Sequence, residues 1–118
     1  MAEQDSGPTV FGKIIRKEIP ASILYEDDQL IVFKDINPVA DTHFLVVPKK
    51  YIKKFDELGA EDGALVSHMM CTAARVAKEQ GLEDGYRLVI NNGPKGGQEV
   101  YHLHLHVIGG RQMSWPPG

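Results

Sequence analysis

The stretch His102-Leu103-His104-Leu105-His106-Val107-Ile108 decides what kind of domain this chain forms. Histidines and aliphatic residues alternate along it, and a β-strand points successive side chains to opposite faces of its sheet. The alternation therefore predicts a strand with three imidazoles on one face and a hydrophobic second face that packs into a core. An imidazole that is neutral near pH 7 can act as a nucleophile, a base or a metal ligand.

The rest of the chain predicts a single α+β domain. We expect residues 1–9 to form a disordered lead-in, and residues 10–118 to form one domain that includes the C-terminal tail. Apolar residues at helical spacing predict a short helix over 10–18 and a long one over 60–80. β-branched and aromatic runs predict five strands, over 22–26, 29–35, 43–47, 86–91 and 101–108. The expected result is a five-stranded antiparallel sheet with the long helix on one face, packed against Leu103, Leu105 and Val107.

Composition narrows the class of protein. The chain has 118 residues, 42% of them hydrophobic and 25% charged, which is typical of one soluble globular domain. A net charge of −3 and the lack of any basic run longer than Lys49-Lys50 argue against binding to nucleic acid. No apolar stretch is long enough to cross a membrane, and the polar N-terminus does not resemble a signal peptide. We therefore expect a cytoplasmic protein, with the nucleus as a second location. Cys71, the only cysteine, excludes an internal disulfide and makes a cysteine-based metal site improbable.

Two kinds of chemistry fit the three histidines. Zinc needs its nitrogen ligands at about 2.1 Å, but the Cα atoms of His102 and His106 lie about 13 Å apart on an extended strand. A shared ion would need strongly inclined rings or a ligand from elsewhere, such as His43. Nucleophilic catalysis fits better, because each neighbour of His104 lies about 6.6 Å along the strand and can contact a different phosphate oxygen or the leaving group. A backbone carbonyl that accepts the other ring N–H would hold His104 in the required tautomer.

The run His-x-His-x-His followed by two apolar residues is the histidine triad signature. It is accompanied by further matching segments: Asn91, Gly96-Gly97-Gln98, Tyr101 and the tail GGRQMSWPPG over 109–118. From about Val10 to Gly118 the chain therefore resembles the histidine triad (HIT) superfamily, and within it the histidine triad nucleotide-binding (HINT) branch. The resemblance implies the HIT fold and the activity of a purine nucleoside phosphoramidase. Such an enzyme hydrolyses the P–N bond of adenosine and guanosine 5′-phosphoramidates to a nucleoside monophosphate and an amine, with no metal or other cofactor.

The resemblance also implies roles for individual residues. His104 would be the nucleophile that forms a covalent nucleotidyl-histidine intermediate. His106 would contact the phosphate and help the leaving amine take up a proton, while His102 and His43 would form a supporting hydrogen-bond shell. Asp35 would accept the two ribose hydroxyls, with Ile36 beside it. The base pocket would consist of Phe11, Ile14, Ile19, Phe33 and Leu45, and the phosphate contacts would come from Asn91 and from the backbone of Gly97, Gln98 and Glu99.

Position 99 departs from the pattern of the family. Several relatives carry a serine there, and the anionic side chain of Glu99 would repel a phosphate if it pointed inward. We therefore expect only its backbone N–H to take part.

The C-terminal tail bears on assembly. Trp115, the only tryptophan, precedes Pro116-Pro117-Gly118, an extended segment that cannot continue the interior of a sheet. In the family that the chain resembles, two protomers join into one continuous sheet and each tail reaches towards the partner's active site. A homodimer in which Trp115 contacts the partner is therefore expected.

Several functions remain open at this level. The expected ligands are purine nucleoside monophosphates and phosphoramidates. The alternatives are a nonenzymatic nucleotide-binding scaffold that acts through regulatory protein partners, and a zinc-dependent hydrolase. The triad alone also leaves open dinucleoside polyphosphate cleavage, the activity of a sister branch, although the Trp115 tail argues against it.

Overall fold

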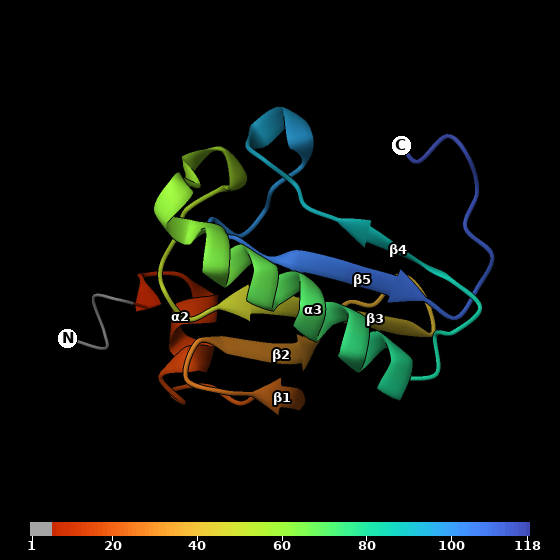
Figure 1. Ribbon diagram of the computed structural model, residues 1–118, viewed down its shortest axis with the longest axis horizontal. Helices are drawn as coiled ribbons and strands as arrows, with labels where there is room; N and C mark the ends of the chain where they lie inside the picture. Colours follow the sequence, from red (N-terminus) through yellow and green to blue (C-terminus); the bar gives the residue numbers. More distant parts are fainter. Residues whose placement is uncertain (1–5) are drawn as a thin grey trace.

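The computed structural model describes residues 6–118. Its antiparallel sheet has the order β1-β2-β3-β5-β4 (Figure 1). The strands are β1 (Ile23–Glu26), β2 (Leu30–Lys34), β3 (Thr42–Pro48), β4 (Tyr86–Val89) and β5 (Leu105–Gly109). The helices are α2 (Val10–Ile15) and α3 (Gly63–Glu79), and three short 3-10 turns cover Phe55–Glu57, Ala60–Asp62 and Pro94–Gly96. The predicted five-stranded α+β fold with one long and one short helix is confirmed. No helix within residues 6–118 has the length and apolar composition needed to cross a membrane.

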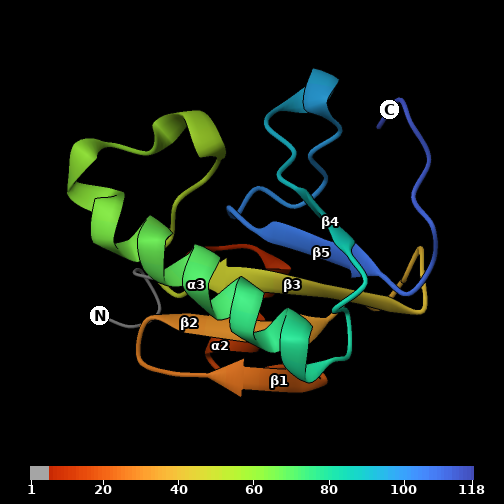
Figure 2. The ribbon, with the colours of Figure 1, turned by 45° about the vertical axis from the view of Figure 1, so that its right-hand side comes forward.

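The long helix α3 covers one face of the sheet, running across β2 and β3 (Figure 2). Leu103, Leu105 and Val107 point to this face, where they are buried against side chains of α3 such as Met69 and Val76. Burying an aliphatic side chain of this size stabilises a fold by about 1.5–3 kcal/mol. The aliphatic half of the alternating stretch therefore packs into the core, as predicted.

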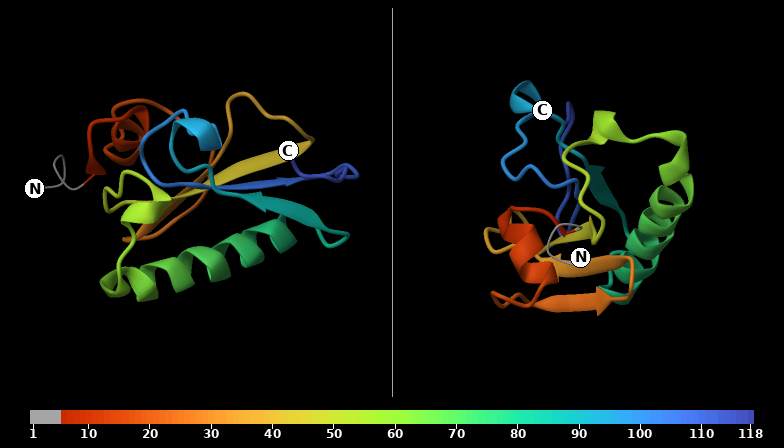
Figure 3. Two further views of the ribbon diagram at one scale, coloured as in Figure 1. Left: turned by 90° about the horizontal axis from the view of Figure 1, so that it is seen from above. Right: turned by 90° about the vertical axis from the view of Figure 1, so that its left-hand side faces the viewer.

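The short helix α2 lies on the opposite face (Figure 3). Its Phe11 and Ile14 pack against a second cluster of buried residues: Ile31, Phe33, Leu45 and Val47. Thr9 caps the helix, with its side-chain oxygen accepting a hydrogen bond of 3.2 Å from the backbone N–H of Phe11. The helix ends at Ile15, three residues before the predicted end at residue 18, because Lys17 takes the left-handed conformation with φ of 65°. The long helix likewise begins at Gly63, later than the expected residue 60, because residues 60–62 form a 3-10 turn.

The segment just before α2 is part of the domain. Ser6 and Gly7 are buried. The guanidinium of Arg16 donates hydrogen bonds to the Ser6 hydroxyl at 2.9 Å and to the Gly7 carbonyl at 2.8 Å. Within the expected lead-in over residues 1–9, Ser6, Gly7 and Thr9 therefore make contacts with the domain. Residues 1–5 of the expected lead-in lie outside the described part of the chain.

Strand β5 begins at Leu105, and not at Tyr101 as predicted. Its ladder with β3 runs from the pair Thr42 and Gly109 to the pair Val46 and Leu105. Before that point the chain is held by groups outside the ladder, because the backbone N–H of Leu103 donates to the Ile52 carbonyl at 2.7 Å. The first two histidines of the triad therefore precede the strand, and only His106 lies within it.

Candidate active site

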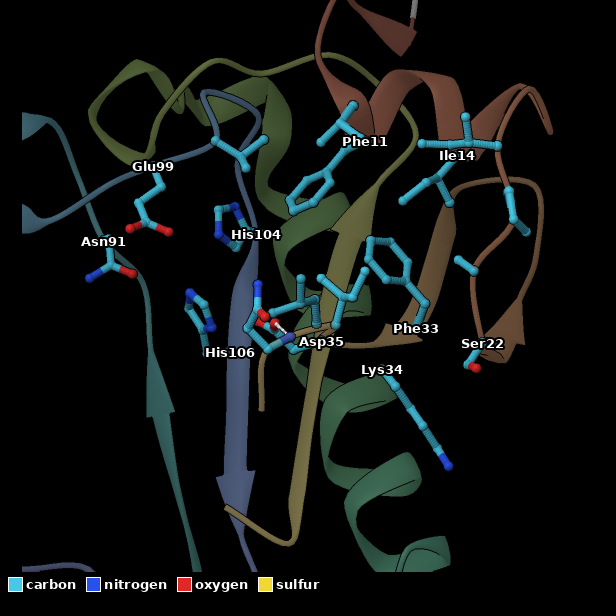
Figure 4. A pocket seen from close by; sticks show the side chains of 18 of the residues that line it. Phe11, Ile14, Ser22, Phe33, Lys34, Asp35, Asn91, Glu99, His104 and His106 are labelled. Atoms are coloured by element: carbon cyan, nitrogen blue, oxygen red, sulfur yellow. Dashed lines mark hydrogen bonds between the residues drawn. The ribbon is translucent and has the colours of Figure 1, made fainter. Parts of the chain in front are cut away.

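A pocket of about 790 Å³ opens on the α2 face of the sheet (Figure 4). All five residues expected to form a base pocket line it: Phe11, Ile14, Ile19, Phe33 and Leu45. Asn91, Gly97 and Glu99 also line it, and in Figure 4 Asn91 and Glu99 lie beyond His104 and His106, away from Phe33 and Ser22. The pocket thus has an apolar end and a polar end, with the imidazoles between them. Its volume is typical of sites for small organic ligands.

His104 is buried at 6% exposure beside the pocket, and its tautomer is fixed by its own chain. Its Nδ1 lies 2.7 Å from the carbonyl oxygen of His102. A carbonyl oxygen only accepts, so Nδ1 carries the proton and Nε2 has a free lone pair when the ring is neutral. Burial lowers the pKa of His104, although the His102 carbonyl and the charge of Asp35 act in the opposite direction. The edge contact with Phe11, with ring centroids 5.0 Å apart, helps to hold the ring.

His43 fixes the tautomer of His106 in a similar way. The backbone N–H of Val39 donates to Nδ1 of His43 at 3.2 Å, so the proton of the neutral His43 ring is on Nε2. That Nε2 lies 2.9 Å from Nδ1 of His106, which must accept, leaving an N–H on Nε2 of His106. Burial, together with the neighbouring His104 and His43, lowers the pKa of His106 to about 4, against the opposing effect of Asp35. His106 is therefore neutral at pH 7 and has a hydrogen-bond donor to offer a ligand in the pocket.

Asp35 follows the last residue of β2 and lines the same pocket together with Ile36, whose side chain is 90% exposed. One carboxylate oxygen accepts from the backbone N–H of Asn37 at 2.8 Å, and the other lies 3.3 Å from Nε2 of His43. Each carboxylate oxygen has lone pairs left for further donors. The structure thus places Asp35, the residue expected to bind ribose, at the pocket wall. The contacts with Asn37 and His43 hold its carboxylate there.

His102 is fully buried, and it is not among the residues that line the pocket. Its Nε2 donates to the Pro48 carbonyl at 2.8 Å, and its Nδ1 has no partner among residues 6–118. Burial lowers its pKa, with the Pro48 carbonyl opposing and His104 adding to the effect. His102 and His43, which were expected to form a supporting hydrogen-bond shell, support different rings, because His43 lies opposite Ile108 in the β3–β5 ladder and reaches His106. His102 supports the site through its carbonyl, which orients His104.

The loop before the triad holds the residues expected to contact phosphate. Asn91 and Gly97 line the pocket, and the side-chain amide of Asn91 donates to the Gly96 carbonyl at 2.8 Å. Gln98 is buried and does not line the pocket. Its amide instead fastens the loop, donating to the carbonyls of Lys53 and Val100 at 3.0 and 3.1 Å and accepting from the N–H of Gly93 at 2.9 Å. The side chain of Gln98 thus has a structural role, and the expected contact of its backbone with phosphate stays a prediction.

Glu99 differs from the expectation in the position of its side chain. It lines the pocket, and Figure 4 shows its carboxylate extending towards the side where Asn91 and His106 lie. The expectation had limited Glu99 to a backbone contact. Its negative charge is consequently a property of the pocket itself.

The sequence interpretation missed other residues of the pocket: Val10, Pro20, Ala21, Ser22, Lys34, Asn37 and Val100. Val10 belongs to the apolar stripe of α2, so helical periodicity could have indicated it. The others carry no spacing signal. A backbone carbonyl was expected to accept the other ring N–H of His104, and the structure identifies it as that of His102. The contacts of the Pro48 carbonyl with His102 and of the Val39 N–H with His43 depend on the fold and have no signal in the sequence.

Within residues 6–118, one group of side chains could hold a metal ion, with ligand atoms of Asp35, His43 and His106 all within 4.8 Å of one another. This set differs from the triad set considered from the sequence. It shares His106, and the outside ligand His43, with the ligands considered from the sequence, and it adds Asp35.

The C-terminal tail lies away from this pocket in the protomer. Trp115 is 81% exposed, and the guanidinium of Arg87 on β4 holds the tail through a hydrogen bond of 2.6 Å to the Ser114 carbonyl. Trp115 is not among the pocket-lining residues.

Comparison with known proteins gives a consistent result. The family model described as "HIT domain" matches residues 16–113. An uncharacterised HIT-like protein of Synechococcus elongatus is 54% identical, with 96% of this chain and 99% of the relative covered. A 14 kDa zinc-binding protein of Zea mays is 50% identical, with 97% and 91% covered. Among solved structures, a HIT family hydrolase from Legionella pneumophila is 48% identical, with a TM-score of 0.88 and 90% and 96% of the two chains covered.

Proposed function

The chain belongs to the HIT domain family, and from that premise we propose that it is a purine nucleoside phosphoramidase of the HINT branch. The proposed reaction is hydrolysis of the P–N bond of adenosine and guanosine 5′-phosphoramidates, which yields a nucleoside monophosphate and an amine. Likeness to a HIT family hydrolase supports hydrolytic chemistry in general. The more specific reaction is supported by the arrangement of the pocket.

The observation that carries the proposal is the orientation of His104. A nucleophilic imidazole must be neutral and must keep one nitrogen free for attack. The 2.7 Å bond from Nδ1 to the His102 carbonyl and the lowered pKa of His104 meet both requirements. A histidine with only a structural role would need neither a neutral ring nor a free nitrogen facing a pocket.

The two ends of the pocket suit the two parts of a nucleotide. A purine is flat and largely apolar, and the apolar end offers Phe11, Ile14 and Phe33 to it. Asp35 lies between that end and the imidazoles, where its carboxylate can accept hydrogen bonds from ribose hydroxyls. A phosphate would then lie beside His104 and His106. The donors nearest to it would be the N–H of His106 and the backbone N–H groups of residues 97–99.

The proposed chemistry takes place in two steps. In the first, Nε2 of His104 attacks phosphorus, a P–Nε2 bond forms and the P–N bond to the amine breaks. The leaving nitrogen takes up one proton, for which His106 is the neighbouring donor. A bound phosphate favours protonated His106, because negative charge beside an imidazole raises its pKa. In the second step, water attacks phosphorus, the P–Nε2 bond breaks, and the water proton restores the protonation of the site.

We also propose that the chain acts as a homodimer, with Trp115 contacting the partner subunit. Tryptophan is enriched at protein interfaces, and its 81% exposure in the protomer leaves most of the side chain free for such a contact. Light scattering that gives twice the chain mass of 13.1 kDa would support the dimer. A monomer mass at all concentrations would refute it.

A metal-dependent role is a second candidate. The grouping of Asp35, His43 and His106 supports it, and the maize relative carries the name of a zinc-binding protein. A strong chelator separates the two candidates, since it should abolish metal-dependent turnover and leave a histidine nucleophile unaffected.

The proposal is tested by trapping the intermediate. The protein is mixed with adenosine phosphoramidate, quenched within milliseconds to seconds, and digested for peptide mass analysis. An adenylyl group on the peptide that contains His104 is expected. His104→Asn should show no adduct and lose more than about 10³-fold in kcat, while it retains AMP binding. Full activity of His104→Asn would exclude the mechanism.

A further inference from the structure

The polar end of the pocket carries a charge that the proposed mechanism does not use. Apart from the histidines, the ionisable residues that line the pocket are Lys34, Asp35 and Glu99. Lys34 is the last residue of β2 and Asp35 follows it, whereas Glu99 comes from the loop before the triad. In Figure 4 the carboxylate of Glu99 lies near Asn91, with no oppositely charged group drawn beside it. Among residues 6–118, Glu99 has no hydrogen bond or ion pair, so its charge is available to a ligand.

The position of Glu99 identifies which part of a substrate it would meet. The nucleoside takes the apolar end of the pocket, and phosphorus lies next to Nε2 of His104. The attacking and leaving atoms lie on opposite sides of phosphorus in such a displacement, so the amine cannot share the space of the nucleoside or of His104. It leaves through the remaining end, which Asn91 and Glu99 line.

We propose that Glu99 determines specificity by the charge of the leaving amine. Phosphoramidates whose amine carries an additional ammonium group are preferred over neutral substrates of the same shape, and those whose amine carries a carboxylate are disfavoured. This inference rests on the proposed function. It concerns the choice of substrate and assigns Glu99 no part in making or breaking bonds.

The size of the effect follows from the exposure of Glu99. Two unit charges about 6 Å apart interact weakly in bulk water and several times more strongly near a protein surface. The Glu99 side chain is exposed, so solvent and salt screen much of its field. A preference of about three- to tenfold in kcat/KM is therefore expected, and it should shrink as ionic strength rises.

The test uses three adenosine phosphoramidates that differ at the far end of the amine. Butylamine provides a neutral end, diaminopropane replaces the terminal methyl group with ammonium, and β-alanine provides a carboxylate. The wild-type protein should rank them cation, neutral, anion by kcat/KM. Glu99→Gln should bring the ratio of cation to neutral close to one, and Glu99→Lys should invert it. Glu83→Gln removes the same charge from an exposed position that does not line the pocket, and it should keep the wild-type ratio.

The possible outcomes are distinguishable. Turnover of all three substrates by the wild type with equal kcat/KM, or a ratio that Glu99→Gln leaves unchanged, overturns the inference and leaves the proposed function intact. No turnover of any of the three overturns the proposed function and the inference with it. The wild-type ratio measured from about 10 mM to about 500 mM salt needs no variant. A cation preference that does not decrease over this range also overturns the electrostatic explanation.

Discussion

Nε2 of His43 lies 2.9 Å from Nδ1 of His106, and this hydrogen bond joins β3 to β5 on the pocket side of the sheet. Nε2 of His43 also lies 3.3 Å from a carboxylate oxygen of Asp35. Because His43 accepts from the backbone of Val39, the direction of the pair is set by the fold. His43 therefore acts as a positioning residue, since it decides which nitrogen of His106 offers a proton to the pocket.

Replacing His43 should weaken catalysis without abolishing it. His43→Ala removes the donor to His106, which can then adopt either tautomer, and we expect a fall in kcat of about 10- to 100-fold, the effect of losing one to two hydrogen bonds of ordinary strength. His43→Gln keeps a side-chain N–H donor and should recover part of the rate. Nitrogen NMR of the His106 ring checks the cause, because the tautomer should be mixed in His43→Ala and single in the wild type. A single Nε2–H tautomer in His43→Ala would contradict the assigned role.

Asp35 should affect the binding of ribose specifically. If its carboxylate accepts the two ribose hydroxyls, Asp35→Ala should raise the Kd of AMP about tenfold or more, since hydrogen bonds to a charged group contribute about 1.5–3 kcal/mol. The dideoxy analogue of AMP, which lacks both hydroxyls, should bind equally to the wild type and to the variant. Calorimetry with the two ligands and the two proteins completes the cycle. An equal loss of affinity for both ligands would show that Asp35 acts only through the fold or through His43.

Asp27 should make stability depend on pH in the acid range. Burial raises its pKa, but hydrogen bonds from Tyr25 at 2.6 Å, from His68 at 2.7 Å and from the N–H groups of Gln29 and Leu30 outweigh burial and hold the pKa well below its usual value. A depressed pKa in the folded state contributes stability that is fully present above the unfolded pKa, near 3.9, and is lost as pH falls below it.

Urea unfolding between pH 7 and pH 3 detects the onset of this loss. We expect Asp27→Asn to cost about 1–3 kcal/mol at pH 7, because an amide cannot accept all four hydrogen bonds, and to flatten the decline of stability in acid. The exposed neighbour Asp28 provides the matched control, Asp28→Asn, which should follow the wild-type curve. Parallel curves for wild type and Asp27→Asn would count against the prediction.

Gly12 in α2 should not tolerate alanine, although alanine is the better helix former by about 1 kcal/mol. A Cβ at this position would collide with the carbonyl oxygens of Gly7 and Ser6, both of which are backbone atoms. Gly12→Ala should therefore lower the thermal unfolding midpoint and weaken AMP binding, since α2 carries the Phe11 wall of the pocket. Gly63→Ala, where a Cβ meets nothing within 4 Å, is the control and should be neutral or stabilising. Unchanged AMP binding in Gly12→Ala would show that the pocket wall does not depend on this packing.

The alternation of histidines and leucines was sufficient to predict the two faces of the chain at the triad, and apolar periodicity was sufficient for α3. The extent of β5 was not predictable in this way. Whether residues 101–104 join the sheet depends on the Ile52 and Pro48 carbonyls, which lie about fifty residues away in the chain. The hydrogen-bond partner of His43 is likewise set by tertiary contacts, and the conformation of Lys17 is set by its local backbone. Neither feature produces a periodic pattern in the sequence.

The predictable part of the site consists of the histidine triad and of the pocket residues that the family resemblance implies. Gln98 shows the limit. Its buried side chain fastens the loop before the triad, and no pattern in the sequence indicates this hydrogen bonding. Glu99 shows the same limit, because the direction of its carboxylate depends on how the neighbouring loop folds.

The aliphatic residues between the histidines connect the core under α3 directly to the pocket. Leu103 and Leu105 belong to the core beneath α3, yet each is bonded on both sides to a residue that faces the pocket or supports it. A cavity made in that core can therefore displace an imidazole without any residue of the pocket being changed. The same stretch of backbone carries core residues and reacting groups. Substitutions in the core under α3 are therefore expected to change the alignment of the imidazoles.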